Sequence, residues 1–181
     1  MNKEEIRKRA VRSATKLTAG GFRPSGENTE SWLGRVFLYS EDESIPTDSK
    51  GNQLLPLAQI YLPNLPFIPD CLKGIDVISA FIGREYPGEF EPMGQTWLIR
   101  EYSDLGTLKR KELEPDESFI KAFPVSSELT ENDWPNWDGG GLDEEASDAI
   151  LELEDSGEIE DYYDIADHEY GHKVGGYPSF C

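Results

Sequence analysis

Short apolar runs alternate with polar and proline-rich stretches along this chain, and the pattern predicts a sheet-rich fold. The segments that combine β-branched and aromatic residues at strand length are 32–39, 57–62, 76–82, 96–102 and 119–125. Clusters of Gly and Pro separate these segments at short intervals, which favours antiparallel pairing. Residues 57–62 are apolar almost throughout, so we expect this strand to be buried on both faces.

Helical periodicity appears near both ends of the chain. The first helical segment, 3–17, is basic and amphipathic, and we expect it to stop at Gly20-Gly21. Its apolar residues at helical spacing are Ile6, Ala10, Ala14 and Leu17. The second segment has a face that is almost entirely Asp and Glu, and we expect it to end at Ser156-Gly157. Its apolar residues are Leu142, Ala146, Ile150 and Leu153.

These elements predict an α+β protein, a single domain over 1–181 that is sheet-rich and largely antiparallel. Within it we expect an N-terminal amphipathic basic helix in 1–19 and a sheet core in 20–125. Residues 126–181 form an acidic segment that contains the acidic helix and a terminal Gly-Gly-Tyr-Pro turn. Trp134 and Trp137, in the loop before that helix, are predicted at the edge of the core.

The charge is distributed unevenly and narrows the functional classes. The chain has 36 acidic and 17 basic residues, a net charge of −19. Residues 122–181 hold 17 of the acids and one base. This balance argues against phosphate neutralisation on nucleic acids and against anionic membranes, and favours a basic protein partner. The N-terminus lacks the apolar region of a secretory signal, and no run reaches the length of a membrane span, so we expect a cytoplasmic protein.

The acidic third is the predicted partner-binding surface. Tyr162 and Tyr163 are the expected aromatic anchors within it, because Tyr is favoured at binding hot spots. Its carboxylates are Asp143, Glu144, Glu145, Asp148, Glu152, Glu154, Asp155, Glu158, Glu160, Asp161 and Asp164. The leading hypothesis is a non-enzymatic bacterial interaction protein of the toxin-immunity type, without a cofactor, that covers a basic partner. The alternatives are a DNA mimic that inhibits a nucleic-acid-binding enzyme, and a solvated acidic face without a partner.

The stretch HEYGH raises an enzymatic alternative. His168, Glu169 and His172 fit H-E-x-x-H, in which a helix points two imidazoles at zinc and the glutamate polarises a water. A third ligand would have to come from an acid such as Asp167 or from Cys181, since the chain has two histidines. Gly171 weakens the required helix. The alternative is that His172 packs beside a turn and His168 is exposed.

Cys71, which follows a proline-rich run, is interpreted as a buried small hydrophobe.

Several stretches in order, GGFRP, PLAQIYLPNLP, TWLIREY, WPNWD and GHKVGGYPSF, resemble the bacterial YwqG-like family, a domain of unknown function. The resemblance covers nearly the whole chain and implies an α+β fold with an internally duplicated, sheet-rich core. It supplies no catalytic residues, and it implies that His172 serves a strand entry. An internal similarity between residues 17–25 and 172–180 agrees with duplication. Family members continue after the GGYP turn into a second half, so a symmetric homodimer that supplies this half is a further expectation.

Overall fold

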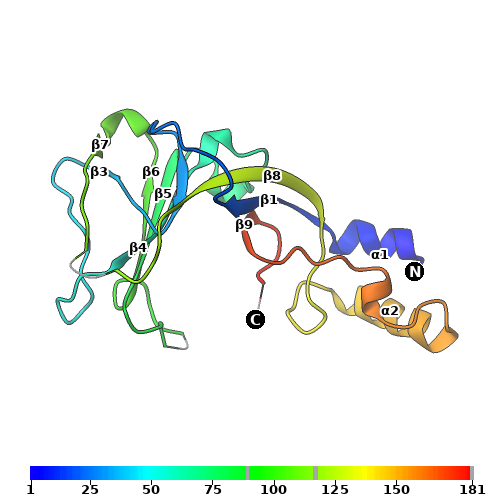
Figure 1. Cartoon of the computed structure of the whole chain (residues 1–181). Helices are drawn as coiled ribbons and strands as arrows, with labels where there is room; N and C mark the ends of the chain where they lie inside the picture. The colour runs from blue at the N-terminus through cyan, green and yellow to red at the C-terminus, as the bar shows by residue number, and fades with distance from the viewer. Residues whose placement is uncertain (89, 116–117, 180–181) are drawn as a thin grey trace. The chain divides into compact units, whose positions relative to one another are not determined.

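The computed structural model describes residues 1–88, 90–115 and 118–179. Its contacts divide the chain into two compact units (Figure 1). The terminal unit contains Met1–Leu17, Pro66–Asp70 and Ser127–Cys181, and the central unit contains Thr18–Leu65 and Cys71–Ser126. No helix among the described residues is both long and apolar enough to cross a membrane.

The described elements are strands joined by loops and short 3-10 turns, with two α-helices. The helices are α1 (Lys3–Ala10) and α2 (Glu144–Ser156), and the 3-10 turns are η1 (Leu62–Asn64), η2 (Asp70–Leu72), η3 (Leu105–Thr107) and η4 (Tyr162–Asp164). The strands are β1 (Arg12–Ala19), β2 (Ser31–Leu33), β3 (Leu38–Tyr39), β4 (Leu55–Tyr61), β5 (Val77–Ile82), β6 (Trp97–Tyr102), β7 (Lys109–Arg110), β8 (Phe123–Asp133) and β9 (His172–Gly175).

The main sheet confirms the prediction of a largely antiparallel, sheet-rich α+β protein. Its strand order is β6-β5-β4-β2-β8-β1-β9, and strands β3 and β7 form a separate antiparallel pair. The pairs β4–β5, β5–β6, β2–β4, β2–β8 and β1–β9 are antiparallel. Strands β1 and β8 contribute residues to both units, whereas β9 belongs to the terminal unit and β2, β4, β5 and β6 to the central unit.

The terminal unit is organised around the packing of α1 against α2 (Figure 1). Asn2 begins α1 with a reciprocal capping box to Glu5, and the Asp143 carboxylate caps α2 by accepting from the amide of Ala146. Gly157 ends α2 in the left-handed region, at φ 75°, as the Ser-Gly pair predicts. The buried cluster between the helices is Ile6, Ala10, Trp134, Ala149, Ile150, Leu153, Ile159, Tyr162 and Ala166.

The N-terminal helix is shorter than its apolar spacing predicts. It ends at Ala10, Val11 is extended, and Arg12–Ala19 form strand β1. The prediction of helix to residue 17 is therefore wrong. The register with β9, in which Ala14 pairs with Gly175 and Leu17 with His172, supplies long-range backbone hydrogen bonds that the local periodicity cannot reveal.

The central unit packs one face of β4 and β5 against the segment 36–39. The predicted strand 32–39 is wrong as one element, because it divides at Gly34 into β2 and β3. Gly34 has φ 71°, and a Cβ there would overlap the Lys121 carbonyl. Beyond this break, the Gln59 carboxamide accepts from the amides of Phe37 and Leu38 at 3.0 and 2.9 Å. The two apolar clusters of this core are Trp32, Phe37, Leu38, Val77 and Leu108, and Val36, Tyr39, Leu54 and Phe81.

Candidate interaction surface

The acidic surface of the terminal unit is built on helix α2. The helix turns Ala146, Ala149, Ile150 and Leu153 into the core, so its carboxylates lie on the solvent side. The exposed members of the predicted set are Asp143, Glu144, Glu145, Asp148, Glu152, Asp155, Glu158, Glu160, Asp161 and Asp164, while Glu154 is half-buried. The structure thus brings together the carboxylates of one helix face and the turn that follows it.

The charge of α2 opposes its own helix dipole at one end. Glu144 and Glu145 lie in the first turn, where carboxylates are favoured, but the last turn has no basic residue. Glu154 and Asp155 lie there instead, at the negative end of the dipole, and Glu152 lies in the turn before. Each such charge costs a helix about 0.3–1 kcal/mol at low ionic strength. The acidity of the C-terminal half of α2 is therefore not explained by helix stability.

Helix α1 brings one cation to each end of this surface. Arg9 pairs with Glu145 at 2.7 Å and with Asp143 at 3.5 Å. The hydrogen bond to Glu145, its charge and that of Asp143 raise the pKa of Arg9, although its solvent exposure limits the energy involved. The Lys3 ammonium donates to the Glu158 carbonyl at 3.0 Å. Within the described part of the chain, Arg9 is the cation that forms ion pairs with these carboxylates.

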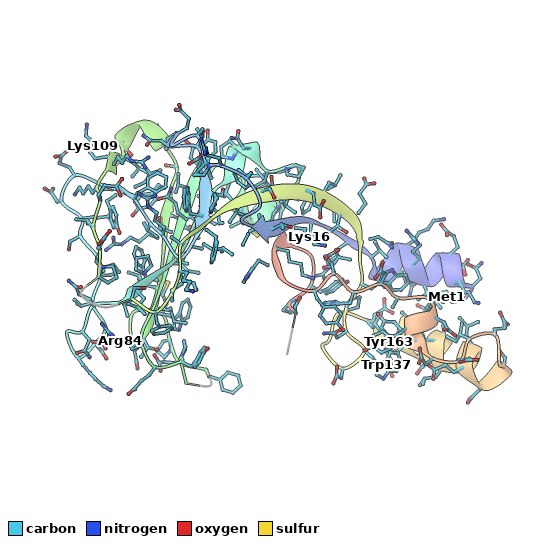
Figure 2. All side chains as sticks on the ribbon, viewed as in Figure 1. Met1, Lys16, Arg84, Lys109, Trp137 and Tyr163 are labelled. Atoms are coloured by element: carbon cyan, nitrogen blue, oxygen red, sulfur yellow. The ribbon has the colours of Figure 1, made fainter. Side chains whose placement is uncertain are left out.

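The aromatic residues beside the acids have unequal roles. Tyr162 is 3% exposed, and its hydroxyl donates to the Pro135 carbonyl at 2.8 Å, so it supports the surface from below. Burial raises the pKa of Tyr162. Tyr163 is 53% exposed and Trp137 37% exposed; both rings contact Tyr162, at 5.2 and 5.3 Å between ring centroids (Figure 2). The exposed aromatic pair is therefore Tyr163 and Trp137.

Trp137 is the member of this pair that sequence reasoning missed. It was predicted at the core edge together with Trp134, and the two differ because Trp134 is 1% exposed. The available signal was its setting, between Asn136 and Asp138 in a loop that continues into three glycines.

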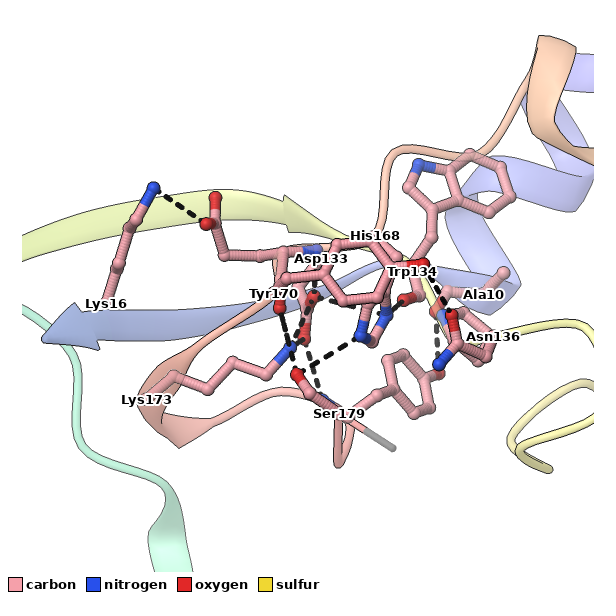
Figure 3. Close-up of polar contacts among 12 residues, drawn as sticks. Ala10, Lys16, Asp133, Trp134, Asn136, His168, Tyr170, Lys173 and Ser179 are labelled. Atoms are coloured by element: carbon pink, nitrogen blue, oxygen red, sulfur yellow. Dashed lines mark hydrogen bonds and ion pairs between the residues drawn. The ribbon is translucent and has the colours of Figure 1, made fainter. Parts of the chain in front are cut away.

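The HEYGH stretch does not form a helix. Residues 167–170 are extended or irregular, and His172 begins strand β9. His168 is buried and His172 is exposed, so the expectation of an exposed His168 is wrong. The His168 Nδ1 atom donates to the Trp134 carbonyl at 2.5 Å, which fixes the hydrogen on Nδ1. The other ring nitrogen lies 3.2 Å from the Ser179 hydroxyl (Figure 3).

Asp133 lies at the centre of this buried network. Its side chain is fully buried and pairs with Lys173, whose ammonium lies 2.9 and 3.0 Å from the two carboxylate oxygens. The amides of Glu169 and Tyr177 also donate to it, at 3.0 and 2.7 Å. The Asp133 carboxylate thereby holds strand β9 and the Gly-Gly-Tyr turn against the end of β8 (Figure 3).

Ser179, His168 and Asp133 follow one another in space in the order of a catalytic triad, but their hydrogen bonds are different. The imidazole donates to Trp134, whereas the Asp133 carboxylate lies 3.9 Å from the ring nitrogen and is occupied by Lys173 and the amides. The Ser179 hydroxyl also lies 3.2 Å from the Glu169 carbonyl. A triad needs the carboxylate to orient the imidazole, so this network is structural.

The described residues hold no group of three or more His, Cys, Asp or Glu side chains placed to bind a metal ion. Cys181, named as a candidate third ligand, lies outside the described residues. Cys71 is exposed, so its interpretation as a buried hydrophobe is wrong. Cys71 is the middle residue of the 3-10 turn η2.

The comparisons with known proteins add no family. Neither the scan against protein-family models nor the search of curated proteins finds a match to this chain. The resemblance to the YwqG-like family therefore stays a prediction.

Proposed function

We propose that this protein is a non-enzymatic interaction protein whose terminal unit docks a basic protein partner. The observation that carries the proposal is the row of exposed carboxylates on the solvent face of α2, which continues into a last turn where Glu154 and Asp155 work against the helix dipole and which has no basic residue of its own. A sequence that breaks a local stability rule without a local gain is most economically explained by function.

The partner suited to this surface has a basic patch with a cleft or rim that accepts aromatic rings. Tyr163 and Trp137 provide amphipathic anchors that a cationic side chain can approach face-on. The carboxylates around them steer association and select against acidic partners, rather than supplying most of the affinity. A toxin that acts on nucleic acid has a cleft of this charge, which fits an immunity role in a bacterial cytoplasm.

Two charge-reversal variants test the proposal. In the first, Glu152, Asp155 and Asp164 are changed to Lys; in the matched control, the exposed Glu27, Asp42 and Glu101 of the central unit are changed to Lys. Both alter the net charge equally. Each purified protein is used to capture partners from the source cells, and captured proteins are identified by mass spectrometry and re-bound in purified form.

We expect a basic protein that binds the wild type and the control but not the terminal variant. Equal binding by all three proteins would contradict the proposal. A DNA mimic would bind through the same surface. A captured partner that binds duplex DNA and this chain at the same time would exclude a mimic; where DNA displaces the chain, the activity of the captured protein, a toxin or another nucleic-acid-binding enzyme, separates the two hypotheses.

A further inference from the structure

The loop between β5 and β6 exposes large apolar side chains to solvent. Tyr86 is 91% exposed, Phe90 94% and Met93 54%, and the first two are the most exposed large hydrophobic residues among those described. The described residues of this loop are drawn in green in Figure 1. Scattered exposed apolar residues are normal, but a cluster at one loop marks an interaction site or an aggregation hazard.

Hydrogen bonds among the described loop residues hold them without these apolar side chains. The Glu91 carboxylate accepts from the amides of Gly88 and Thr96 at 3.1 and 2.8 Å, and from the Thr96 hydroxyl. The hydrogen bond from the Thr96 side chain is the largest cause of the lowered pKa of Glu91. The Trp97 indole donates to the Glu91 carbonyl at 2.9 Å. A loop ordered in advance loses little conformational entropy when it binds.

Phe90 occupies a backbone conformation that suits glycine. Its φ is 58°, and it is the one non-glycine residue with positive φ among the described residues. A bulky side chain in this region is a true outlier and costs roughly 1–3 kcal/mol. Burial of the phenyl ring does not offset this free-energy cost, because the ring is 94% exposed. Folding alone therefore does not account for a phenylalanine here.

The charges around the loop distinguish among possible occupants. Membrane-binding loops combine apolar tips with Lys and Arg that contact anionic headgroups. Here Arg84 is the basic residue of the loop, and Glu85 and Glu91 flank the tip, so the tip lacks the cluster of Lys and Arg that contacts an anionic bilayer. A rigid aromatic side chain that enters a desolvated pocket is the usual anchor of a protein interface.

We propose that the β5–β6 loop is a docking element whose Phe90 and Tyr86 insert into an apolar pocket of a partner protein with a positively charged rim. This proposal does not rest on the acidic surface of α2, because every residue that carries it belongs to the central unit. The loop supplies the aromatic anchors, and Glu91 supplies the fixed geometry that presents them.

The test uses the full chain with a photo-cross-linking phenylalanine analogue in place of Phe90, expressed in the source cells. The matched control carries the analogue at Phe119, which is 67% exposed in the same unit. Cross-linked residues are mapped by mass spectrometry, and the identified protein is purified and titrated against wild type, Phe90→Gly and Phe119→Ser. Vesicles of zwitterionic and of anionic lipid are titrated in parallel.

We expect one protein adduct at position 90, mapped to residues that line an apolar pocket, and no such adduct at position 119. Phe90→Gly removes the backbone strain, so it should melt at or above the wild-type temperature and yet bind the purified partner at least about 30-fold more weakly, as a hot-spot loss does. Phe119→Ser should bind as the wild type does. No adduct, adducts only to lipid or to a second copy of the chain, or an unchanged affinity of Phe90→Gly would overturn the proposal.

Discussion

Replacing Lys173 by Met tests whether the Asp133 carboxylate organises the terminal unit. The substitution keeps the length of the side chain but removes the ammonium that lies 2.9 and 3.0 Å from the two carboxylate oxygens. Asp133 then keeps only the amides of Glu169 and Tyr177 in a site where its side chain is fully buried.

The expected cost follows from this geometry. Removing one partner of a buried ion pair costs about 3–5 kcal/mol. Because two amide donors remain, we expect the lower end, about 3 kcal/mol, which for a chain of this size corresponds to a fall in melting temperature of roughly 6–12 °C. This is a large share of the roughly 5–15 kcal/mol by which a typical domain is stable.

The assay is urea and thermal unfolding at neutral pH, followed by circular dichroism and tryptophan fluorescence. The control is Lys16→Met, which breaks a partly exposed pair with Glu169 at 2.7 Å and should cost under about 1 kcal/mol. The double variant Asp133→Asn with Lys173→Met should cost less than the sum of the single variants, because neither charge is then left unpaired. A cost below about 1 kcal/mol for Lys173→Met, or strict additivity, would refute the reasoning.

Three further predictions concern stability. Asp155→Lys removes an acid from the last turn of α2, so it should raise the free energy of unfolding by about 0.3–1 kcal/mol at low salt, and less at high salt, in urea titrations. Burial raises the pKa of Tyr39 to about 12 and also raises that of Tyr162; the neutral forms therefore favour the fold. The contribution of Tyr39 is complete below about pH 10 and is lost as the pH rises through about 12, while that of Tyr162 is lost at higher pH. Unfolding free energies measured between about pH 10 and 12, with tyrosinate absorbance as the titration signal, test this: stability that does not fall over that range would disprove it. Gly176→Ala should lower the melting temperature, because Gly176 has φ 68° and a Cβ would overlap the Asp133 carboxylate; a melting temperature equal to that of the wild type would show that the turn can move.

The sequence predicted the elements whose signal is local. Strands β4, β5 and β6 lie within a residue or two of the apolar runs at 57–62, 76–82 and 96–102. Helix α2 lies where its periodicity and the Ser156-Gly157 stop place it. Where a structure depends on distant partners, the local pattern was misleading: residues 12–17 fit a helical spacing, yet pairing with β9 makes them a strand.

The candidate site was predicted in part for the same reason. The net charge of a segment can be counted from the sequence, so the acidic surface was predicted without a structure. The choice between neighbouring aromatics was not, since Tyr162 and Tyr163 are adjacent and only the packing on Pro135 and Trp137 decides which ring is exposed. Likewise, nothing local marks Asp133 or Lys173 as a buried pair, because β8 and β9, which carry them, come near each other only in the folded chain, on either side of β1.

The most direct test of the central claim is the association rate of the captured basic partner with the wild-type chain, measured at a series of salt concentrations. The same series is measured for the triple reversal at Glu152, Asp155 and Asp164, and for its matched control in the central unit. If the acidic surface of α2 steers the partner, the terminal variant will associate at least about tenfold more slowly at low salt and with a shallower salt dependence, while the control follows the wild type. Identical rates and salt slopes for the terminal variant and the wild type would contradict the claim.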